Sequence, residues 1–422
     1  MPVNPDKRIQ GVIDQLNYQF EHSPYFLGAK FDSPLEQKDE LIMSVVIPAR
    51  NEFPNVVHTC YSIWHAWEAE GHDPAQIEII IVANCCTDFQ KEGFDPRKPG
   101  DKGTTEYLMA RGGYWARKIR VLYDPVAGNH SARNKGAAIA RGKYVFFSDA
   151  HMAYKPGFFT LMMETIDKTG GMFHGVIAWM GAYPPHGGGL GCGYTLKLGE
   201  EIKGTWNNYF LSEDKMFYIP ALGHCSVGAL RDQFIKFGGY PNVHRSYGGG
   251  EFYINMKWWM FGSSVSTHPK AIGYHLASGR GYTWNHDDYL HNVFNIGYAL
   301  GMDDWLERAY INCLRKGRKE VLDRMMAEAK IEAKEDRKYI EQHRKMTFNE
   351  LLVKRPWKTM NEELHGKGLD NILIYHDSWI DYQLKEAPEY VQKMYHNSET
   401  QKKLAKFIDE NLGDFVYKRK KK

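Results

Sequence analysis

Apolar and polar residues follow two different periods between positions 41 and 151. Short apolar runs predict buried strands at residues 41–47, 77–83, 119–123 and 143–148. Apolar or small residues at helical spacing predict helices over residues 55–70 and 131–141. Strands that are apolar on both faces are typical of a sheet covered by helices on both sides. The pattern therefore predicts an α/β fold with a Rossmann-like, mostly parallel sheet flanked by helices.

The pattern changes further along the chain. Residues 155–300 are rich in glycine and aromatic side chains, and long charged helical patterns begin near Asp303. We therefore expect three parts: an N-terminal arm or helix (1–40), an α/β domain (41–302) and an α-helical C-terminal region (303–422) that ends in the basic tail Lys418–Lys422.

Composition narrows the class of protein. Hydrophobic residues make up 43% and charged residues 25%, which is typical of a globular chain, and the net charge of +3 is too small to predict a polyanion partner. The six cysteines include no Cys-x-x-Cys pair. Residues 1–10 lack the apolar stretch of a signal peptide, and no window reaches the ~18 apolar residues of a membrane span. We expect a soluble, cytoplasmic protein without membrane insertion.

In open α/β sheets, ligands bind at the carboxyl ends of the strands. Three polar segments stand at such ends: Pro48–Glu52, Asn84–Asp88 and Asp149–His151. Alternate residues at a strand end point to the same side, so the side chains of Asp149 and His151 can reach one ion. A carboxylate and an imidazole suit a divalent ion such as Mn²⁺, with Mg²⁺ as the other candidate. Such an ion can bridge the two phosphates of a nucleotide sugar.

Five ordered motifs extend this pattern. They are Ser44–Glu52 (SVVIPARNE), Ile79–Asn84 (IIIVAN), Gly128–His151 with its Asp-Ala-His end, Gly248–Glu251 (GGGE) and Gly273–His275 (GYH). In this order they resemble the GT-A fold glycosyltransferases of the large family-2-like group. The Asp-x-His form is most similar to the polypeptide N-acetylgalactosaminyltransferases, although the C-terminal region does not resemble their lectin module. The resemblance covers roughly residues 41–285.

The resemblance implies a metal-dependent transferase that uses a UDP-sugar as donor, in which the metal ligands would be Asp149, His151 and His275. Glu251 and Asp149 would be the catalytic residues. The donor would be bound by a larger set: Pro48, Ala49, Arg50, Glu52, Asn84, Asp88, Arg133 and Gly249. An arginine in this set suits a phosphate, because its planar fork matches two phosphate oxygens.

Two departures from the family pattern affect these expectations. Relatives usually end the second strand with aspartates that contact the base, whereas this chain has Ala83-Asn84, with Asp88 four residues further on. Many inverting relatives have an aspartate after the glutamate of the Gly-Gly-Glu segment, whereas Phe252 follows Glu251 here. The Asp-x-His form favours retention of configuration at the transferred sugar.

The sequence leaves the acceptor open. A glycan, a hydroxymethylated pyrimidine in DNA and a protein side chain are all candidates, and Arg315–Lys319 and the basic tail could contact phosphates. Two other functions are weighed. A nucleotide-sugar pyrophosphorylase or other nucleotidyltransferase usually has a glycine-rich loop after the first strand, which Pro48–Glu52 lacks. A non-catalytic protein that binds nucleotide sugars would not need the combination of metal ligands with Glu251.

Overall fold

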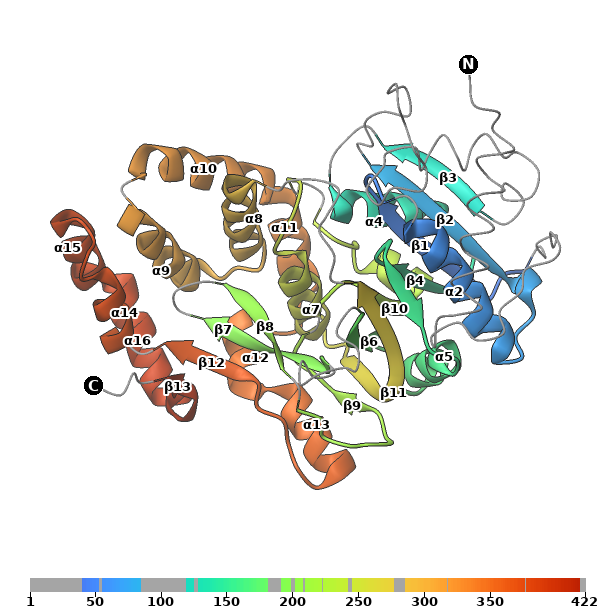
Figure 1. Ribbon diagram of the computed structural model, residues 1–422. Coiled ribbons are helices and arrows are strands. Elements are labelled where there is room, and N and C mark those ends of the chain that lie inside the picture. The colour runs from blue at the N-terminus through green and yellow to red at the C-terminus, as the bar shows by residue number, and fades with distance from the viewer. Residues whose placement is uncertain are drawn as a thin grey trace, which may run out of the picture.

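The computed structural model describes residues 40–417 except 53–54, 85–118, 125–127, 181–190, 199–201, 208, 222, 242–244, 277–284, 317 and 376. The predicted arm, Asp88 and the basic tail therefore lie outside the described residues. The elements predicted from the N-terminal half are present as β1 (Met43–Ala49), α2 (Asn55–Ala69), β2 (Ile77–Asn84), β3 (Ile119–Asp124), α4 (Asn129–Ile139) and β4 (Tyr144–Ser148). Figure 1 shows them in blue to green.

These strands form one side of a nine-stranded sheet with the order β3-β2-β1-β4-β10-β6-β11-β5, and β9 pairs with β11. The later strands are β5 (Met152–Tyr154), β6 (Met172–Met180), β9 (Phe217–Tyr218), β10 (Ser226–Leu230) and β11 (Val265–Leu276). Strands β3, β2, β1 and β4 run parallel, while β10 is antiparallel to both of its neighbours. This arrangement confirms the predicted α/β class with a mainly parallel sheet.

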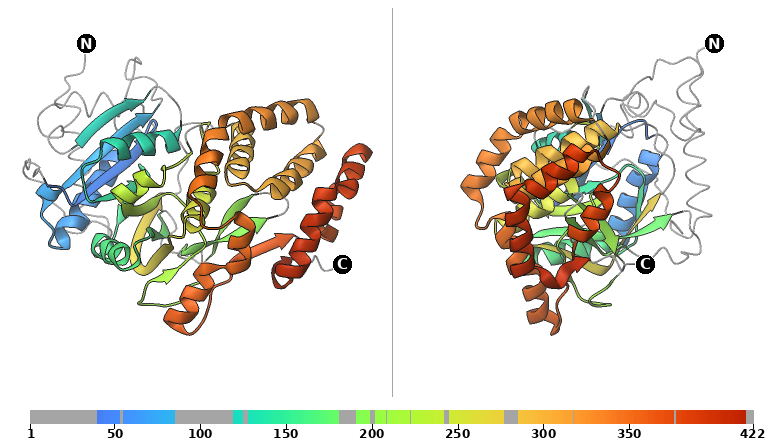
Figure 2. Two further views of the ribbon diagram at one scale, coloured as in Figure 1. Left: turned by 180° about the vertical axis from the view of Figure 1, so that it is seen from behind. Right: turned by 90° about the vertical axis from the view of Figure 1, so that its left-hand side faces the viewer.

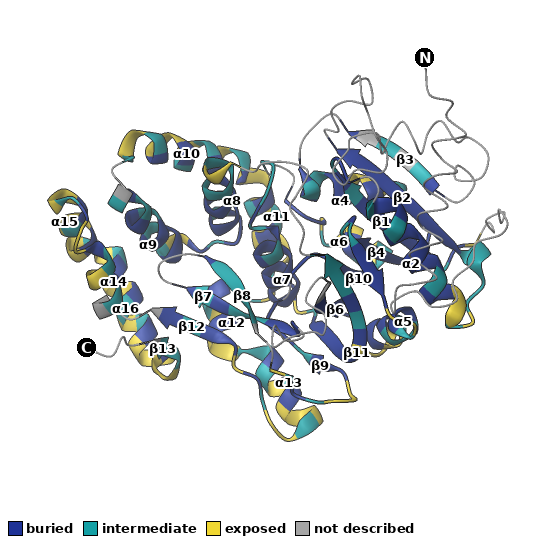
Figure 3. Ribbon diagram, in the orientation of Figure 1, coloured by how far each residue is buried: buried dark blue, intermediate teal, exposed yellow. Residues whose placement is uncertain are grey.

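Strand β1 is buried on both faces, which explains its unbroken apolar run. Val45 packs into the core on the side of α2, and Val46 packs into the core on the side of α4. Helix α4 lies close to the sheet because the residues that face the sheet are small, namely Ala132, Gly136 and Ala137. A Cβ atom added at Gly136 would come within 2.3 Å of Val46 Cγ1. Figure 3 shows these central strands as buried.

The remaining helices of the sheet region are α5 (Phe158–Thr169), α6 (Arg231–Lys236), α7 (Gly250–Met260) and the 3₁₀ turn Pro74–Gln76. Further along the chain come α8 (His286–Ala299), α9 (Asp303–Cys313), α10 (Lys319–Glu332), α11 (Lys334–His343), α12 (Phe348–Lys354), α13 (Pro356–His365), α14 (Asp377–Leu384), α15 (Glu389–Asn397) and α16 (Glu399–Asn411), with 3₁₀ turns at Leu314–Lys316 and Gly413–Phe415. The C-terminal region is therefore mainly helical, as predicted. Figure 1 and the left view of Figure 2 both place α14–α16 on the far side of the molecule from β1–β3.

A second sheet of four strands joins the two halves of the chain. Its order is β13-β12-β7-β8, with β7 at Gly193–Leu198, β8 at Lys203–Asn207, β12 at Ile372–Tyr375 and β13 at Val416–Tyr417. Strand β12 runs parallel to β7, and Ile372 pairs with Leu196. The sequence pattern did not predict β12 and β13, because a strand of four residues is too short for its period to stand out among charged helices. Among the described residues, no helix has the length and apolarity that crossing a membrane requires.

Candidate functional site

Asp149 follows β4 directly and is held in place from three directions. Its backbone N–H donates to the carbonyl oxygen of Cys225 at 3.1 Å. Its carboxylate accepts a hydrogen bond from Arg133 Nη2 at 2.8 Å, and His275 Nε2 lies 3.5 Å from Oδ2. Burial alone raises the pKa of this carboxyl, but the hydrogen bond from His275 and the charge of Arg133 outweigh burial and hold the pKa well below its usual range. Asp149 is therefore an anion at neutral pH.

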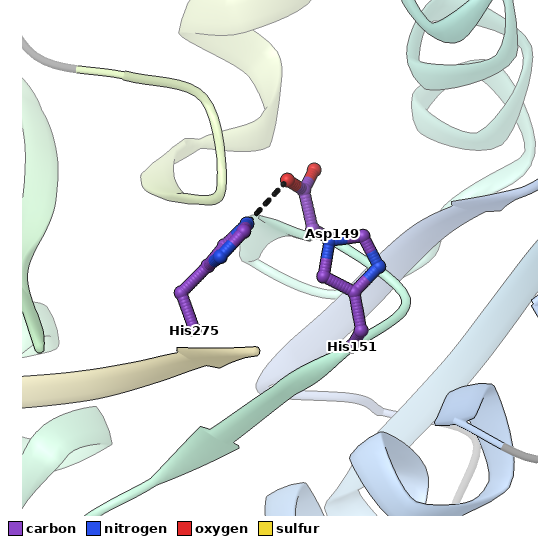
Figure 4. Close-up of side chains that lie close together, drawn as sticks. All are labelled: Asp149, His151 and His275. Atoms are coloured by element: carbon purple, nitrogen blue, oxygen red, sulfur yellow. Dashed lines mark ion pairs between the residues drawn. The ribbon is translucent and has the colours of Figure 1, made fainter. Parts of the chain in front are cut away.

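His275 reaches the same place from a distant part of the chain. It lies near the end of β11 and pairs in register with Met152 of β5, so it stands beside His151. The two imidazole rings are 4.8 Å apart and nearly perpendicular, at 86°. One ligand atom from each of Asp149, His151 and His275 lies within 4.8 Å of those of the other two. Figure 4 shows the three side chains converging on one small space.

Glu52 lies behind this group rather than facing open solvent. Its Oε2 atom is 3.1 Å from His151 Nδ1, and its side chain is 9% exposed. The chain reaches this position through Asn51, a non-glycine residue with φ of 58° at the end of β1. A left-handed residue in this position is uncommon and costs conformational energy, so the turn that brings Glu52 to His151 is strained.

Asn84 connects the ends of two strands and the start of a helix. Its Nδ2 atom donates to the carbonyl oxygen of Ala49 at 3.3 Å, and its Oδ1 atom accepts from the backbone N–H of Gly128 at 3.5 Å. It thereby ties the end of β2 to the end of β1 and to the N-terminus of α4. The amide of Asn84 therefore maintains the local backbone.

Arg133 is fully buried on α4. Besides Asp149, its guanidinium donates to the carbonyl oxygens of His224 at 3.3 Å and Asn129 at 3.4 Å. The ring of Tyr240 lies 5.8 Å from its Cζ atom. These contacts direct much of its hydrogen-bonding capacity toward the protein itself, and in particular toward Asp149.

Glu251 stands in the first turn of α7, and three glycines before it explain how it gets there. Gly248 and Gly249 have φ values of 106° and 82°, which side chains rarely adopt. Gly250 has an ordinary φ, but a Cβ atom there would lie 1.9 Å from His130 Nε2. The glycine run therefore lets the chain turn twice and then lets α7 begin against the buried His130.

The segment before these glycines is held by α8. Asn292 is fully buried, and its side chain accepts from the backbone N–H of Arg245 at 2.9 Å. It also donates to the carbonyl oxygens of Arg245 at 2.7 Å, Tyr247 at 3.0 Å and Gly248 at 3.3 Å. Ser246 donates to Asp288, also on α8, at 2.7 Å. The segment is thus fixed by side chains instead of by a sheet.

These elements surround a cavity of about 380 Å³. Nine of the residues singled out from the sequence line it: Pro48, Arg50, Glu52, Asn84, Arg133, Asp149, His151, Glu251 and His275. Ala49 and Gly249 are not part of the lining that the described residues form, and Asp88 lies outside those residues. The cavity lies at the carboxyl ends of the parallel strands, where the fold class places ligands.

The cavity also has a wall that sequence reasoning missed. Tyr194, Trp206 and Tyr247 line it, together with Gly223, His224 and Ser246. Tyr247 directly precedes the glycine run, and that neighbourhood was the one signal available for it. Tyr194 and Trp206 come from β7 and β8 of the second sheet, which are short and only partly buried and therefore leave a weak apolar pattern.

The chain is similar to known proteins over part of its sequence and in its fold. Residues 44–180 match the family model described as glycosyl transferase family 2. Among curated proteins, none matches the chain. The solved structure of GalNAc-T7 with UDP, GalNAc and Mn²⁺ is similar in fold, with a TM-score of 0.57 and 17% identity. The match covers 77% of this chain, which spans only 58% of the length of that one.

Two more distant structures are also similar. A mannosyltransferase from Pyrobaculum calidifontis, solved with GDP-Man and Mn²⁺, has a TM-score of 0.40 and 14% identity, over 93% of this chain and 99% of that one. Residues 1–349 of TarS from S. aureus have a TM-score of 0.41 and 13% identity, over 90% of this chain and 93% of that one. The likeness to the GalNAc-T7 structure shows a shared fold. The match to the glycosyl transferase family 2 model lies within this fold, at residues 44–180.

Proposed function

We propose that the chain transfers a sugar from a UDP-sugar to a hydroxyl acceptor with the help of a divalent metal ion. The observation that carries the proposal is the convergence of Asp149, His151 and His275 within a cavity at the carboxyl ends of the strands. The match of residues 44–180 to a glycosyltransferase family model supports it. UDP is the first nucleotide to test, because a structure of similar fold contains it.

The three side chains fit a divalent ion chemically. One carboxylate and two imidazoles favour Mn²⁺ over Mg²⁺, because Mg²⁺ prefers an all-oxygen shell. When bound, the ion would offset negative charge on the departing diphosphate. Asp149 would hold it as the anionic ligand. His151 would offer Nε2, because Glu52 is hydrogen-bonded to the Nδ1 side of the ring.

The other residues of the cavity have roles that follow from their positions. Pro48, Arg50 and Asn84, at the ends of β1 and β2, would form the wall for the nucleoside. Arg133 is hydrogen-bonded to Asp149 and would orient that carboxylate toward the ion, in addition to any contact with the substrate. Glu251 would accept hydrogen bonds from hydroxyls of the transferred sugar or the acceptor. The Asp-x-His form favours retention at the transferred carbon.

The test is a screen of sugar donors. Purified protein is incubated with Mn²⁺ and each common nucleotide sugar, and release of nucleoside diphosphate is measured with and without a chelator. We expect release from one UDP-sugar, loss of release with chelator and a slower rate when Mg²⁺ replaces Mn²⁺. Release of pyrophosphate would instead identify a nucleotidyltransferase, and binding without any turnover would identify a non-catalytic protein.

A variant of one ligand sharpens the test. Asp149→Ala removes the anionic ligand, so UDP release should fall by about a hundredfold or more. Asp167→Ala is a matched control, because Asp167 is an exposed aspartate that pairs with Lys143 on the surface. If Asp149→Ala kept the rate of the unmodified protein, the proposed metal site would be wrong.

A further inference from the structure

The part of the cavity contributed by the second sheet is a pair of aromatic rings. Tyr194 on β7 and Trp206 on β8 are direct cross-strand partners. Their ring centroids lie 4.9 Å apart at an angle of 88°, so one ring meets the other edge-on. Both rings line the cavity and both are partly exposed. We call this pair the aromatic wall.

The aromatic wall is rigid, because glycine backbone presses against both rings. A Cβ atom added at Gly204 would lie 2.2 Å from Tyr194 Cδ2, and one at Gly191 would lie 2.4 Å from Trp206 Cε3. At Gly223 the nearest atom would be the Tyr194 hydroxyl, at 2.6 Å. Side chains at these three positions would push the rings out of place. Rings that are fixed before binding lose little conformational entropy when a ligand stacks on them.

The aromatic wall lies close to the groups that would carry out the reaction. The chain after Gly223 continues to His224 and Cys225, whose carbonyl oxygens bind Arg133 and Asp149 respectively. Strand β8 packs against α7, the helix that presents Glu251 (Figure 1). Burial raises the pKa of the Tyr194 hydroxyl above its ordinary value, and the nearby Glu251 carboxylate raises it further. The hydroxyl is therefore a neutral group that can donate a hydrogen bond at physiological pH.

We propose that the aromatic wall is the acceptor subsite and that it takes a pyranose ring of a carbohydrate. This inference rests on the proposed function. The nucleoside wall of Pro48, Arg50 and Asn84 comes from β1 and β2, whereas the aromatic wall comes from the other sheet, so the two sets can bind different molecules. The C–H face of a pyranose carries slight positive charge and fits the negative face of an aromatic ring.

The pairing of two arginines outside the cavity lining favours a carbohydrate over DNA. Arg245 is paired with Glu328 at 2.9 Å and Glu332 at 3.3 Å. Within the basic segment Arg315–Lys319, Arg318 forms two hydrogen bonds with Asp287, at 2.8 and 2.7 Å. A phosphodiester backbone would have to compete with these carboxylates for the same arginines. An uncharged sugar ring needs no such exchange.

The experiment separates acceptor use from donor use. Release of UDP from the active UDP-sugar is measured first in water alone, and then with methyl α-glucopyranoside, methyl β-glucopyranoside or N-acetylglucosamine as probe acceptors. We expect at least one sugar to raise the rate in a saturable way. Trp206→Ala should raise the KM for that sugar by about tenfold, which corresponds to the stacking energy of one ring. UDP release in water and the KM for the UDP-sugar are measured on the same variant, and the ratio of sugar-stimulated to water-supported release is the readout that reports on the acceptor subsite.

Three further variants make the result specific. Trp206→Phe keeps an aromatic face and should restore most of the affinity for the sugar, while Tyr194→Phe tests the hydroxyl alone. Tyr209→Ala is the control, because this tyrosine is 54% exposed and is not among the residues that line the cavity.

An unchanged KM in Trp206→Ala would overturn the subsite. Stimulation by duplex DNA that contains hydroxymethylated pyrimidine, without stimulation by any sugar, would also overturn it. No UDP release from the unmodified protein would instead count against the proposed function itself.

Discussion

At the scale of single residues, two side chains of the cavity hold neighbouring side chains in place through hydrogen bonds. Glu52 is hydrogen-bonded to His151, and Arg133 is hydrogen-bonded to Asp149. Neither Glu52 nor Arg133 has to contact a substrate to affect metal binding. A metal-binding side chain that is held in one orientation binds an ion more tightly than one that rotates. The strained turn at Asn51 directly precedes Glu52 and positions its side chain.

We predict that Glu52→Gln weakens Mn²⁺ binding by about tenfold or more, because a neutral amide orients the imidazole less strongly than a carboxylate does. Titration calorimetry or the electron paramagnetic resonance signal of free Mn²⁺ measures the change directly. Glu70→Gln is the matched control. Glu70 is another buried glutamate near a histidine, with its Oε2 atom 3.6 Å from His72 Nε2, and it lies outside the lining of the cavity. Equal metal affinity in the two variants would show that Glu52 does not position His151.

At the scale of elements, the start of α7 decides where Glu251 lies. Two constraints meet there: the close approach of Gly250 to His130, and the hydrogen bonds from Asn292 on α8 to the segment just before the glycines. Both constraints link α7 to elements that are distant in sequence. Each can be tested by one substitution.

Gly250→Ala should lower the free energy of unfolding by about 1–3 kcal/mol, because the new methyl group overlaps the His130 ring and the core must shift to relieve the overlap. Urea denaturation measures this change. Gly413→Ala serves as control, since a Cβ atom at that glycine meets nothing within 4 Å. A Gly250 variant as stable as the control would mean that His130 moves aside without cost.

Asn292→Ala should disturb catalysis without disturbing the metal site. We expect a lower kcat and unchanged Mn²⁺ affinity, because the freed segment carries Tyr247 and leads to Glu251 but holds none of the three residues proposed to bind the metal ion. The matched control is Asn361→Ala. Asn361 is equally buried, and its side chain bonds the backbone of Tyr218 at 2.8 and 2.7 Å, away from the cavity lining. If both variants lost the same fraction of kcat, the loss would reflect general destabilisation of the fold.

The sequence was sufficient to predict strands β1–β4 of the first sheet and part of the cavity, but not the second sheet. The strands β1, β2 and β4 could be located because runs such as Val45–Ile47 are buried on both faces, and Asp149 and His151 could be paired because alternate residues share a face. The second sheet could not be predicted, since Leu196 and Ile372 become neighbours only through folding. Tyr194 and Trp206 were missed because β7 and β8 are short and only partly buried, so that neither strand has a clear apolar run.

At the scale of the whole molecule, one buried charge affects stability in a pH-dependent way. Lys257 on α7 is fully buried and donates to the carbonyl oxygen of Gly239. Burial lowers the pKa of its ammonium group to about 7, although the charge of Asp336 on α11 partly opposes this shift. The folded protein therefore binds this proton more weakly than the unfolded chain does. The resulting penalty on stability is full below about pH 7 and disappears as the pH rises toward the ordinary lysine value near 10.

Lys257→Met removes this penalty, so we expect the variant to gain stability relative to the unmodified protein at about pH 7. The gain should shrink as the pH approaches about 10. Thermal unfolding at several pH values measures the difference in Tm. Lys168→Met, at an exposed position, should show no such trend. A difference that does not vary with pH would mean that Lys257 keeps its proton when the protein folds.

The pairing of β12 with β7 has a consequence for how the molecule is made. The residues that would hold the metal ion all leave the ribosome before His286, so that half of the cavity can assemble while the chain is still growing. The β7–β8 hairpin is local and can form at the same stage, whereas β12, the other neighbour of β7, is synthesised only after α13. Pairings between residues far apart in sequence also form slowly. A chain interrupted during translation would thus carry Asp149, His151, His275 and both rings of the aromatic wall, but one edge of β7 would have no partner strand.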